Sequence, residues 1–461
     1  MKSLSGQYPK WILSLSLLLL TFISCQKDIR NEAQFKDQAQ FKNGQSMNEL
    51  SPGNSGHEST DVVIGWYNLM MKLIIETPGH TPPVAARSFG YTGVALYESL
   101  IGKDPGYHSL AGQLNGLNSI PQRQYGNSYI APLTANAALA RIIKHLFQNA
   151  SAANMSKIDA LEAANKKMYS GRFNDVLISR SVDYGRLVAD AVFNWSVTDG
   201  GDQGYLRNFP TDFIPAVGID KWIPTPPLFQ SAMLPYWGKN TTMVPANGAG
   251  PIDPPAPPLF SMSSGSEFFA AAFEVYDAGI HLSPEQHEIA MYWNDGSGSF
   301  FPPGHNVAIA LQMIRNRKLN LEQAAALLAK VGIAQNDAAI VCWRAKFVSN
   351  VLRPETFIRN YIDPAWATLI PTPPFPSYTS GHSTFSGAGA TILTAELGNV
   401  SFTDSSKIAY GFSPRSFSDF NDYAQEAAIS RLYGGIHYRF DNENGFKCGQ
   451  QIAMNVEHLN W

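Results

Sequence analysis

The sequence predicts an all-α protein, a large helical bundle whose helices are joined by long Pro- and Gly-rich loops. Three observations favour this class. Apolar residues recur at helical spacing through most of the chain after residue 59. Alternating β-branched runs bounded by turns, the usual signal of strands, hardly occur. The 37 glycines and 30 prolines indicate ordered loops between helices rather than disorder. Two stacked helical halves are a possible arrangement of such a bundle.

The first periodic stretch is 61–76, where Trp66, Met70 and Leu73 share one face. Pro82 and Pro83 open a second helix, because proline suits a first helical turn. It continues through 85–101. Further helices are expected over 133–148, 156–169, 181–196, 267–279, 284–294, 305–315, 321–331, 337–353, 384–397, 423–433 and 444–459.

Residues 200–261 interrupt this pattern, since proline and glycine dominate them. The stretch is either a domain linker or a long loop that wraps the surface. Aromatic and apolar residues are interleaved in it, among them Trp222 and Trp237, and these side chains favour burial. The sequence therefore favours the surface loop.

The N-terminus, residues 1–24, resembles a bacterial lipoprotein signal peptide. Lys2 and Lys10 form its positive region, an apolar core of about ten residues spans 11–20, and Cys25 follows Ser24 as the expected lipidation site. An ordinary secretory signal or a membrane anchor is the alternative, although the core is short of the ~20 residues that a spanning helix needs. Residues 25–58 are polar and predict a flexible tether.

The remaining residues, 59–461, form the expected folded domain. No later stretch has the ~18 uncharged apolar residues of a spanning helix, so this domain should touch a membrane only through lipid. The protein is then exported and anchored on the periplasmic or cell-surface side of a bacterial membrane. The net charge of -3 and the lack of a basic run argue against nucleic-acid binding. Cys342 and Cys448 could pair in an oxidising compartment, but we favour two free thiols.

The first motif that carries chemistry joins Lys346 to Arg353-Pro354. The two cations are seven residues apart, about two helical turns, so they should point the same way. Because Pro354 disfavours helix at the residue before it, Arg353 is expected at a helix end, at the mouth of a cavity. By itself such a pair is more often two solvated surface cations.

The second motif is Ser380-Gly381-His382, which precedes the helix expected over 384–397. A helix start presents free backbone N–H groups and partial positive charge, which suit an anion. Ser380 adds a hydroxyl, Gly381 permits close approach, and His382 can move a proton near neutral pH. In isolation this tripeptide is usually just a turn and a cap.

The third motif is Ser430-Arg431, followed after five residues by His437. Arg431 should close a helix, Gly434 and Gly435 should turn the chain, and His437 should then project back. Asp441 lies four residues later and could orient the imidazole ring. Without the other motifs, a structural histidine beside a loop arginine is the simpler interpretation.

The three motifs together supply the groups that hold a tetrahedral oxyanion. They contain three cations, a hydroxyl, a backbone amide and two histidines. Arginine forks match such oxygens bidentately, lysine adds a point charge, and one histidine can bond the central atom while the other exchanges protons.

In this order the motifs resemble the signature of the superfamily that unites type 2 phosphatidic acid phosphatases with vanadium-dependent haloperoxidases. The likeness is firm over about 280–450, the expected catalytic core, and loose over 60–200. The resemblance implies a bound vanadate with His437 bonded to vanadium and His382 as acid–base. It also implies that Lys346 polarises the bound peroxide. The groups implied to hold the vanadate oxygens are Lys346, Arg353, Ser380, Gly381 and Arg431.

Two residues near the motifs resemble the haloperoxidase branch. Trp343 lies where haloperoxidases often carry a tryptophan, and Phe375 resembles a halide-pocket aromatic of chloroperoxidases, where bromoperoxidases tend to have histidine. The segment 292–305 also resembles bacterial haloperoxidases, and its Asp295 is expected to pair with Arg431. His305, at the end of that segment, is equally well a site residue or part of the loop.

The expected function is therefore vanadate-dependent oxidation of halide by hydrogen peroxide to hypohalous acid, which halogenates an organic acceptor. The first alternative is a soluble acid phosphatase without a cofactor, with His437 as the nucleophile. The second is a non-catalytic surface lipoprotein that binds glycans through its aromatic residues. The family resemblance also implies a possible homo-oligomer, whereas the sequence leaves the halide preference open.

Overall fold

The computed structural model describes residues 57–102 and 106–461. The expected signal peptide, Cys25 and nearly all of the tether lie outside these residues. The described residues fall into two units. The short one, Ile408–Phe412, contains the 3₁₀ turn η4 (Ile408–Tyr410), and the large one contains the other elements named below.

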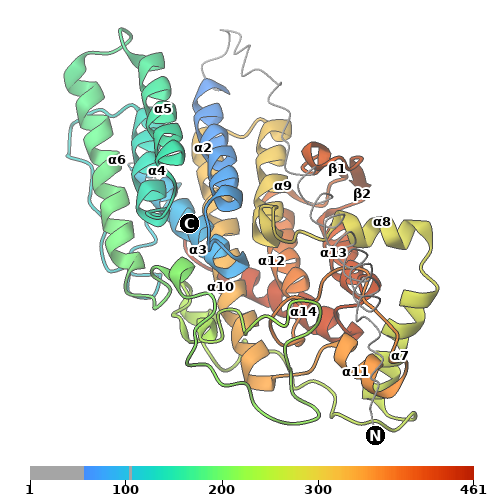
Figure 1. The fold of residues 1–461 in the computed structure, drawn as a ribbon. Helices are drawn as coiled ribbons and strands as arrows, with labels where there is room; N and C mark the ends of the chain where they lie inside the picture. Colours follow the sequence, from blue (N-terminus) through green and yellow to red (C-terminus); the bar gives the residue numbers. More distant parts are fainter. Residues whose placement is uncertain (1–56, 103–105) are drawn as a thin grey trace, which may run out of the picture. The chain divides into compact units, whose positions relative to one another are not determined.

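The large unit is mostly helical, which confirms the all-α class (Figure 1). Its first group of helices, blue to green in Figure 1, comprises α2 (His57–Glu76), α3 (Pro82–Leu100), α4 (Ala131–Leu146), α5 (Ala152–Tyr169) and α6 (Asp175–Ser196). The second group comprises α7 (Glu267–Ile280), α8 (Pro284–Tyr292), α9 (Phe301–Arg317), α10 (Leu321–Ser349), α11 (Pro354–Tyr361), α12 (Gly381–Leu397), α13 (Phe420–Tyr433) and α14 (Arg439–Glu457). The two groups meet where α3 packs along α10.

Helix α10 runs unbroken for 29 residues, so the expectation of two helices over 321–331 and 337–353 is wrong. Asn320 and Gln323 form a capping box at its start, and Asn350 ends it in the left-handed conformation at φ 52°. Within α10, Gly332 allows α3 to approach, because a Cβ there would lie 2.5 Å from the Phe89 carbonyl oxygen. Of the described helices, only α10 is long and apolar enough to cross a membrane, and the stretch that meets this test is wholly buried in the protein.

One short helix and a pair of short strands were not expected from the sequence. Helix α11 has eight residues, too few for a clear helical period, and begins with Pro354 in its first turn. Strands β1 (Phe402–Asp404) and β2 (Arg415–Phe417) pair antiparallel, with Phe402 opposite Phe417. A strand of three residues is too short for an alternation of apolar and polar side chains to predict it.

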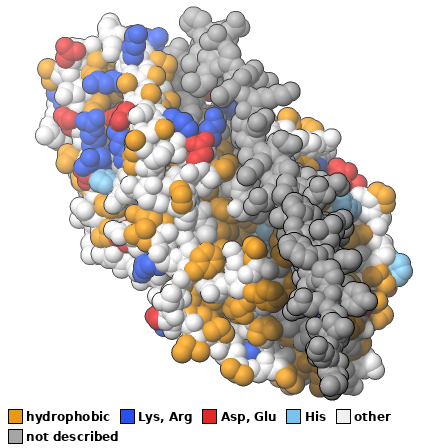
Figure 2. Space-filling model, in the orientation of Figure 1, with side chains coloured by type: hydrophobic (Ala, Val, Ile, Leu, Met, Phe, Trp, Pro, Cys, Tyr) orange, Lys and Arg blue, Asp and Glu red, His pale blue; other side chains and the backbone are white. Residues whose placement is uncertain are grey.

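The stretch 200–261 forms a long loop with three 3₁₀ turns: η1 (Gly204–Leu206), η2 (Trp237–Lys239) and η3 (Pro245–Asn247). Only part of its apolar content is buried, because Trp222 and Trp237 lie inside while Val217 is 99% exposed. Figure 2 shows hydrophobic side chains gathered in the lower part of the molecule, where this loop runs, and charged side chains over α5 and α6. The loop is therefore a surface loop, as expected, with unusually apolar side chains in solvent.

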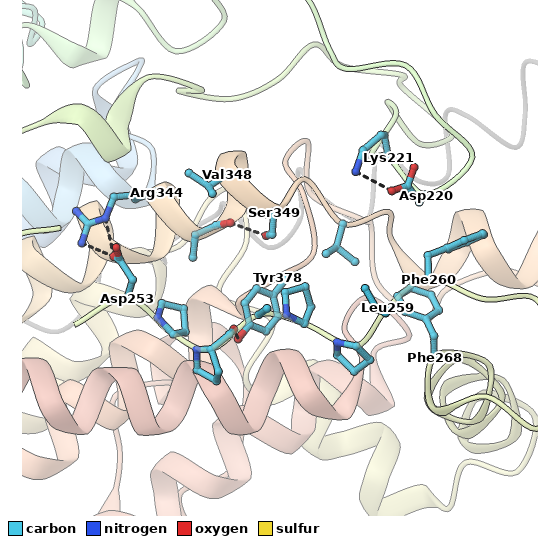
Figure 3. Close-up of a pocket in the computed structure, with 17 residues that line it drawn as sticks. Asp220, Lys221, Asp253, Leu259, Phe260, Phe268, Arg344, Val348, Ser349 and Tyr378 are labelled. Carbon is cyan, nitrogen blue, oxygen red and sulfur yellow. Dashed lines mark hydrogen bonds and ion pairs between the residues drawn. The ribbon is translucent and has the colours of Figure 1, made fainter. Parts of the chain in front are cut away.

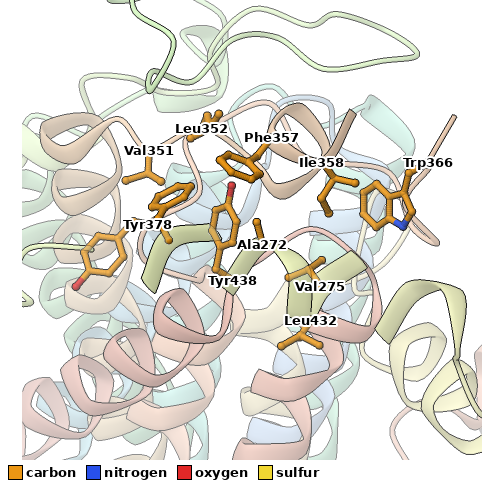
Figure 4. Packing of buried hydrophobic residues seen from close by; sticks show 11 residues of the cluster. Ala272, Val275, Val351, Leu352, Phe357, Ile358, Trp366, Tyr378, Leu432 and Tyr438 are labelled. Carbon is orange, nitrogen blue, oxygen red and sulfur yellow. The ribbon is translucent and has the colours of Figure 1, made fainter. Parts of the chain in front are cut away.

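A cluster of buried hydrophobic residues supports the segments that carry the motifs (Figure 4). Helix α7 contributes Val275, and helix α11 contributes Phe357. The cluster also includes Leu352 and Tyr438, which directly precede Arg353 and follow His437. Burying such side chains is worth about 1.5–3 kcal/mol each, so the backbone on either side of the two motif residues is firmly held.

Candidate active site

The ammonium group of Lys346 lies fully buried near the C-terminal end of α10. Its Nζ donates hydrogen bonds to the carbonyl oxygens of Pro376 at 3.0 Å, Ser377 at 3.0 Å and Thr379 at 2.5 Å. Burial, together with the charge of the nearby Arg353, lowers the pKa of Lys346 to about 7. The hydrogen-bond partners of the lysine are thus backbone carbonyls rather than a carboxylate.

Arg353 does not lie on the same helix as Lys346, because α10 ends at Ser349. It is the residue that precedes α11, and its side chain is fully buried rather than at a cavity mouth. Both sequence expectations about its position are therefore wrong. Its Nε donates to the Phe375 carbonyl at 2.8 Å and its Nη1 to the Ile436 carbonyl at 2.7 Å. The two cations converge through tertiary packing and not through helical spacing.

The side chains of Lys346 and Arg353 both lie against the ring of Phe375. Nζ of Lys346 lies 4.8 Å and Cζ of Arg353 lies 5.0 Å from its centroid. The ring of Trp343 lies 4.9 Å away, centroid to centroid. An aromatic face carries partial negative charge, so the ring eases the repulsion between two buried cations. Trp343 and Phe375, which the sequence placed near the site, are both in contact with it.

His437 is buried and held in one tautomer by its two neighbours. Its Nδ1 lies 2.9 Å from Oδ2 of Asp441, and its Nε2 lies 3.1 Å from Nη1 of Arg353. Because a guanidinium can only donate, Nε2 carries the lone pair and Nδ1 carries the hydrogen that Asp441 accepts. Burial, then the positive charges of Arg353 and Lys346, keeps the pKa of His437 well below its usual value. The ring is therefore neutral, and its Nε2 lone pair accepts from Arg353, so a ligand at Nε2 would take the place of that hydrogen bond.

Asp441 stands at the start of α14, and the turn after α13 brings His437 to it. Gly434 ends α13, and Gly435 has φ 80°, a conformation that glycine adopts freely. Ser377, which sequence reasoning missed, donates its hydroxyl to Oδ2 of Asp441 at 2.5 Å. Burial raises the pKa of Asp441 to about 6, so it is mostly ionised at neutral pH.

Helix α12 begins at Gly381, three residues before the expected start, and Ser380 caps it by accepting from the Ser383 N–H. A Cβ at Gly381 would be in ordinary van der Waals contact with Phe385 at 3.8 Å and Trp343 at 4.0 Å, so the residue lies against the aromatic side chains of the site. An anion at this end would meet free N–H groups.

His382 follows in the first turn of α12 and is partly buried. Its Nε2 is shielded from solvent and has no hydrogen-bond partner. Burial and the charge of Arg431 hold the pKa of His382 well below its usual value, while Asp295 and the Trp293 backbone act in the opposite direction. The imidazole is therefore neutral and able to accept a proton at Nε2.

Arg431 lies in the last turn of α13 and is buried. Its Nη1 donates to the Trp293 carbonyl at 2.7 Å, and its Nε has no partner. Burial lowers the pKa of Arg431 to about 9, which still leaves it charged at neutral pH. A buried N–H without an acceptor is costly and indicates a place for an anionic ligand.

Asp295 does not form the expected ion pair with Arg431. Its Oδ2 accepts from Nδ1 of His305 at 2.8 Å, and its Oδ1 accepts from Lys407. Asp295 acts on Arg431 only through its charge, which opposes the fall in the arginine's pKa. The physical reason is that two cations already occupy both of its oxygens.

His305 is fully enclosed between two carboxylates. Its second nitrogen, Nε2, lies 2.8 Å from Oδ2 of Asp404, which is on β1. Although burial opposes it, the charges of Asp295 and Asp404 raise the pKa of His305 to about 9, so it is an imidazolium at neutral pH. Sequence reasoning missed Asp404 and Lys407, because nothing local in their segments marks them as site residues.

The two cysteines of the domain are free and buried, as we favoured. Cys342 lies next to the lysine segment, with its Sγ 3.6 Å from the Thr379 carbonyl oxygen. Burial raises the pKa of Cys448 to about 12, so this thiol is inert at neutral pH.

A pocket of about 510 Å³ is lined in part by Tyr378, from the 376–379 segment (Figure 3). Its walls include Val348, Leu259 and Phe260, and the ion pair between Arg344 and Asp253 stands at one side. None of the seven motif groups lines it, and its link to them is Tyr378. This pocket is therefore separate from the cluster of cations.

Known proteins of one family are similar to this chain. A family model described as the VCPO second helical-bundle domain matches residues 326–460. A solved structure described as the first bacterial vanadium-dependent iodoperoxidase is 34% identical, covers 89% of this chain and 97% of its own, and superposes with a TM-score of 0.79. A holo-type bacterial vanadium-dependent chloroperoxidase shares the fold at 15% identity, with a TM-score of 0.60 over 89% of this chain and 93% of that one.

Among curated proteins, the vanadium chloroperoxidase of Curvularia inaequalis is 26% identical over 347 residues. The match spans 57% of this chain and 57% of that relative, so the chain aligns with little more than half of its length.

Proposed function

The chain belongs to the vanadium-dependent haloperoxidases, and from this premise we propose that it oxidises a halide with hydrogen peroxide at a bound vanadate. The product is hypohalous acid or its equivalent, which halogenates an organic acceptor. One observation carries the proposal. Arg431 and His382 each keep a buried nitrogen without a partner, Nε and Nε2, beside the buried cations Lys346 and Arg353.

The residues of this site fit a vanadate group. Three buried cations have lowered pKa values, which means that their charges lack full compensation. A tetrahedral oxyanion with two or three negative charges supplies that compensation and accepts the free N–H groups. In the described part of the chain, no group of three or more His, Cys, Asp or Glu side chains could hold a metal ion by itself. The donors present are those of an oxyanion site with one histidine ligand.

Each residue has a role that follows from its contacts. His437 offers Nε2 as the vanadium ligand, and Asp441 fixes its ring through Nδ1. The vanadate oxygens are held by Lys346, Arg353, Arg431, the Ser380 hydroxyl and the Gly381 amide. Vanadate, when bound, supplies a Lewis acid that activates peroxide without changing its own oxidation state. The chain then contributes proton transfer at Nε2 of His382, which is neutral and unpartnered.

Iodide is the halide that we expect this site to oxidise most readily. Iodide needs the weakest oxidant of the common halides, and the relative that is 34% identical is described as an iodoperoxidase. The organic acceptor is not defined by any contact of the described residues.

We also propose that the protein is exported and anchored by lipid at Cys25. Mass spectrometry of the N-terminal peptide tests the modification, and Cys25→Ser should release the protein from membranes. A possible homo-oligomer, suggested by the family, is tested by light scattering of the purified domain.

The function is tested by a paired assay on the chain after Cys25. The protein is reconstituted with orthovanadate and assayed with hydrogen peroxide, a phenolic dye and iodide, bromide or chloride. We expect vanadate-dependent halogenation that His437→Ala abolishes, with iodide fastest. The protein without vanadate is also tested on p-nitrophenyl phosphate. Phosphate release without any halogenation would show that the same groups serve phosphoryl transfer and would overturn the proposal.

A further inference from the structure

We propose that His305 is a positioning residue of the oxyanion site, which fixes the turn after Trp293 so that the Trp293 carbonyl orients Arg431 and His382. The proposal rests on the proposed function of that same site, because it concerns how tightly the oxyanion is held. His305 itself contacts neither of the two oriented side chains through a hydrogen bond. Its effect must therefore pass through Trp293 and Asp295.

The first step is the clamp that holds His305. Its two ring nitrogens lie 2.8 Å from Asp295 and 2.8 Å from Asp404, and all three side chains are almost fully buried. These contacts join helix α9, the loop after α8 and strand β1. Tyr292 completes the clamp by donating its hydroxyl to Oδ2 of Asp404 at 2.8 Å. Buried hydrogen bonds between charged groups are among the strongest in proteins, so these contacts hold the three elements firmly together.

The second step is the turn at residues 293–295. Asp295 has φ 40°, in the left-handed region that a residue with a side chain adopts only at an energetic cost. The contacts of its carboxylate with His305 and Lys407 offset that cost. The indole of Trp293 stacks on the His305 ring, with centroids 4.5 Å apart. His305 therefore stabilises the turn through two contacts, an ion pair with Asp295 and ring stacking with Trp293.

The third step is what the turn presents to the site. The Trp293 carbonyl accepts from Nη1 of Arg431 at 2.7 Å and also interacts with His382. These are the two residues whose remaining nitrogens, Nε and Nε2, are buried without partners. The Trp293 carbonyl thus orients both the guanidinium of Arg431 and the imidazole of His382.

The charged groups around His305 come from several elements. Asp295 and Lys407 face it from loops, Asp404 from β1, and Tyr292 from α8. Further away, Arg431 and His382 act through charge on Asp295 and His305. If His305 were replaced, Lys407 would be the remaining ion-pair partner of Asp295 among the described residues.

The alternative is that His305 merely fills the core. Two isosteric variants separate the alternatives, because an asparagine amide occupies roughly the place of Nδ1 and a glutamine amide roughly that of Nε2. His305→Asn keeps a donor for Asp295, whereas His305→Gln keeps a donor only for Asp404. His80→Gln is the matched control, since His80 is also buried and stacked on an aromatic ring, Phe147, at 4.2 Å.

The experiment measures the dissociation constants of orthovanadate and of phosphate by calorimetry, with the thermal midpoint of each variant. We expect His305→Gln to weaken the binding of both oxyanions by about tenfold or more, and His305→Asn, which loses the ring contact with Trp293 but keeps a donor for Asp295, to weaken it by only about threefold. His80→Gln should lower the thermal midpoint but leave both affinities unchanged.

Equal weakening by His305→Asn and His305→Gln, or unchanged affinities in both, would overturn the positioning role. The same measurements distinguish a failure of the proposed function from a failure of the proposed role of His305. If the unchanged protein binds both oxyanions but oxidises no halide, the proposed function fails while the variants still decide the role of His305. If it binds neither oxyanion, both proposals fail.

Discussion

Arg353 and His437 are joined by a hydrogen bond of 3.1 Å from Nη1 to Nε2, and this contact determines which nitrogen of the histidine is free of hydrogen. The other nitrogen must then donate to Asp441 at 2.9 Å. A cation and a carboxylate on opposite sides of one ring therefore prepare Nε2 as a ligand before any cofactor arrives.

The first prediction concerns the carboxylate of this pair. Asp441→Ala removes the acceptor that holds Nδ1 of His437, so we expect orthovanadate affinity to fall by about 10–100-fold. Asp441→Asn should lose less orthovanadate affinity, because its amide oxygen can still accept the hydrogen bond from Nδ1 of His437. Calorimetric titration with orthovanadate checks both variants. Equal affinities in Asp441→Ala and the unchanged protein would show that the ring is oriented by other contacts.

The second prediction separates binding from proton transfer at His382. His382→Gln removes the neutral imidazole with its free Nε2 but leaves Lys346, Arg353 and Arg431 in place. We expect kcat for iodide oxidation to fall by about 100-fold or more, with orthovanadate affinity within about threefold. Steady-state kinetics on vanadate-saturated protein gives kcat, and calorimetry gives the affinity. A parallel loss of both would assign His382 to oxyanion binding instead.

The third prediction is a pH dependence that comes from Lys346. Its pKa of about 7 means that the lysine is charged below that pH and loses its charge above it. An oxyanion binds the charged form, so above the pKa each binding event must first take up a proton. Affinity should then be flat below about pH 7 and fall by about tenfold per pH unit above it.

Tungstate is the suitable probe, because it stays a tetrahedral dianion from about pH 6 to about pH 9 while phosphate and vanadate titrate. Calorimetry in buffers of different ionisation enthalpy measures the proton uptake directly. Lys346→Gln is the control and should abolish the uptake near pH 8. A flat profile for the unchanged protein would mean that the lysine is not the titrating group.

The fourth prediction tests how closely α12 and α14 must approach. A Cβ at Gly449 would lie 2.2 Å from the carbonyl oxygen of Thr384, so Gly449→Ala forces the two helices apart. We expect a loss of about 1–3 kcal/mol in the free energy of unfolding. Oxyanion affinity should fall too, since α12 begins at Gly381 and α14 carries Asp441 in its first turn.

Gly65→Ala in α2 is the matched control, because its Cβ would meet nothing within 4 Å. It should be neutral or stabilise by up to about 1 kcal/mol through helix propensity. Denaturant unfolding of both variants gives the comparison. Similar effects of the two substitutions would argue against a close contact between α12 and α14.

The sequence by itself determined the features that depend on neighbours along the chain. Helical periodicity located most of the helices, and the spacing of Gly434, Gly435 and His437 indicated the turn that returns the histidine to Asp441. The order of the three motifs also identified the family and predicted which groups would hold an oxyanion. These signals are readable because a turn, a cap or a helix face involves residues only a few positions apart.

Only the tertiary structure decided how the groups compensate one another. Arg353 meets Lys346 across Phe375 although α10 ends at Ser349, and Asp295 pairs with Lys407, 112 residues away, instead of Arg431. The bond from His305 to Asp404 spans 99 residues. No local pattern marks such partners, because a buried charge is matched by whichever side chain the packing of distant elements brings within reach.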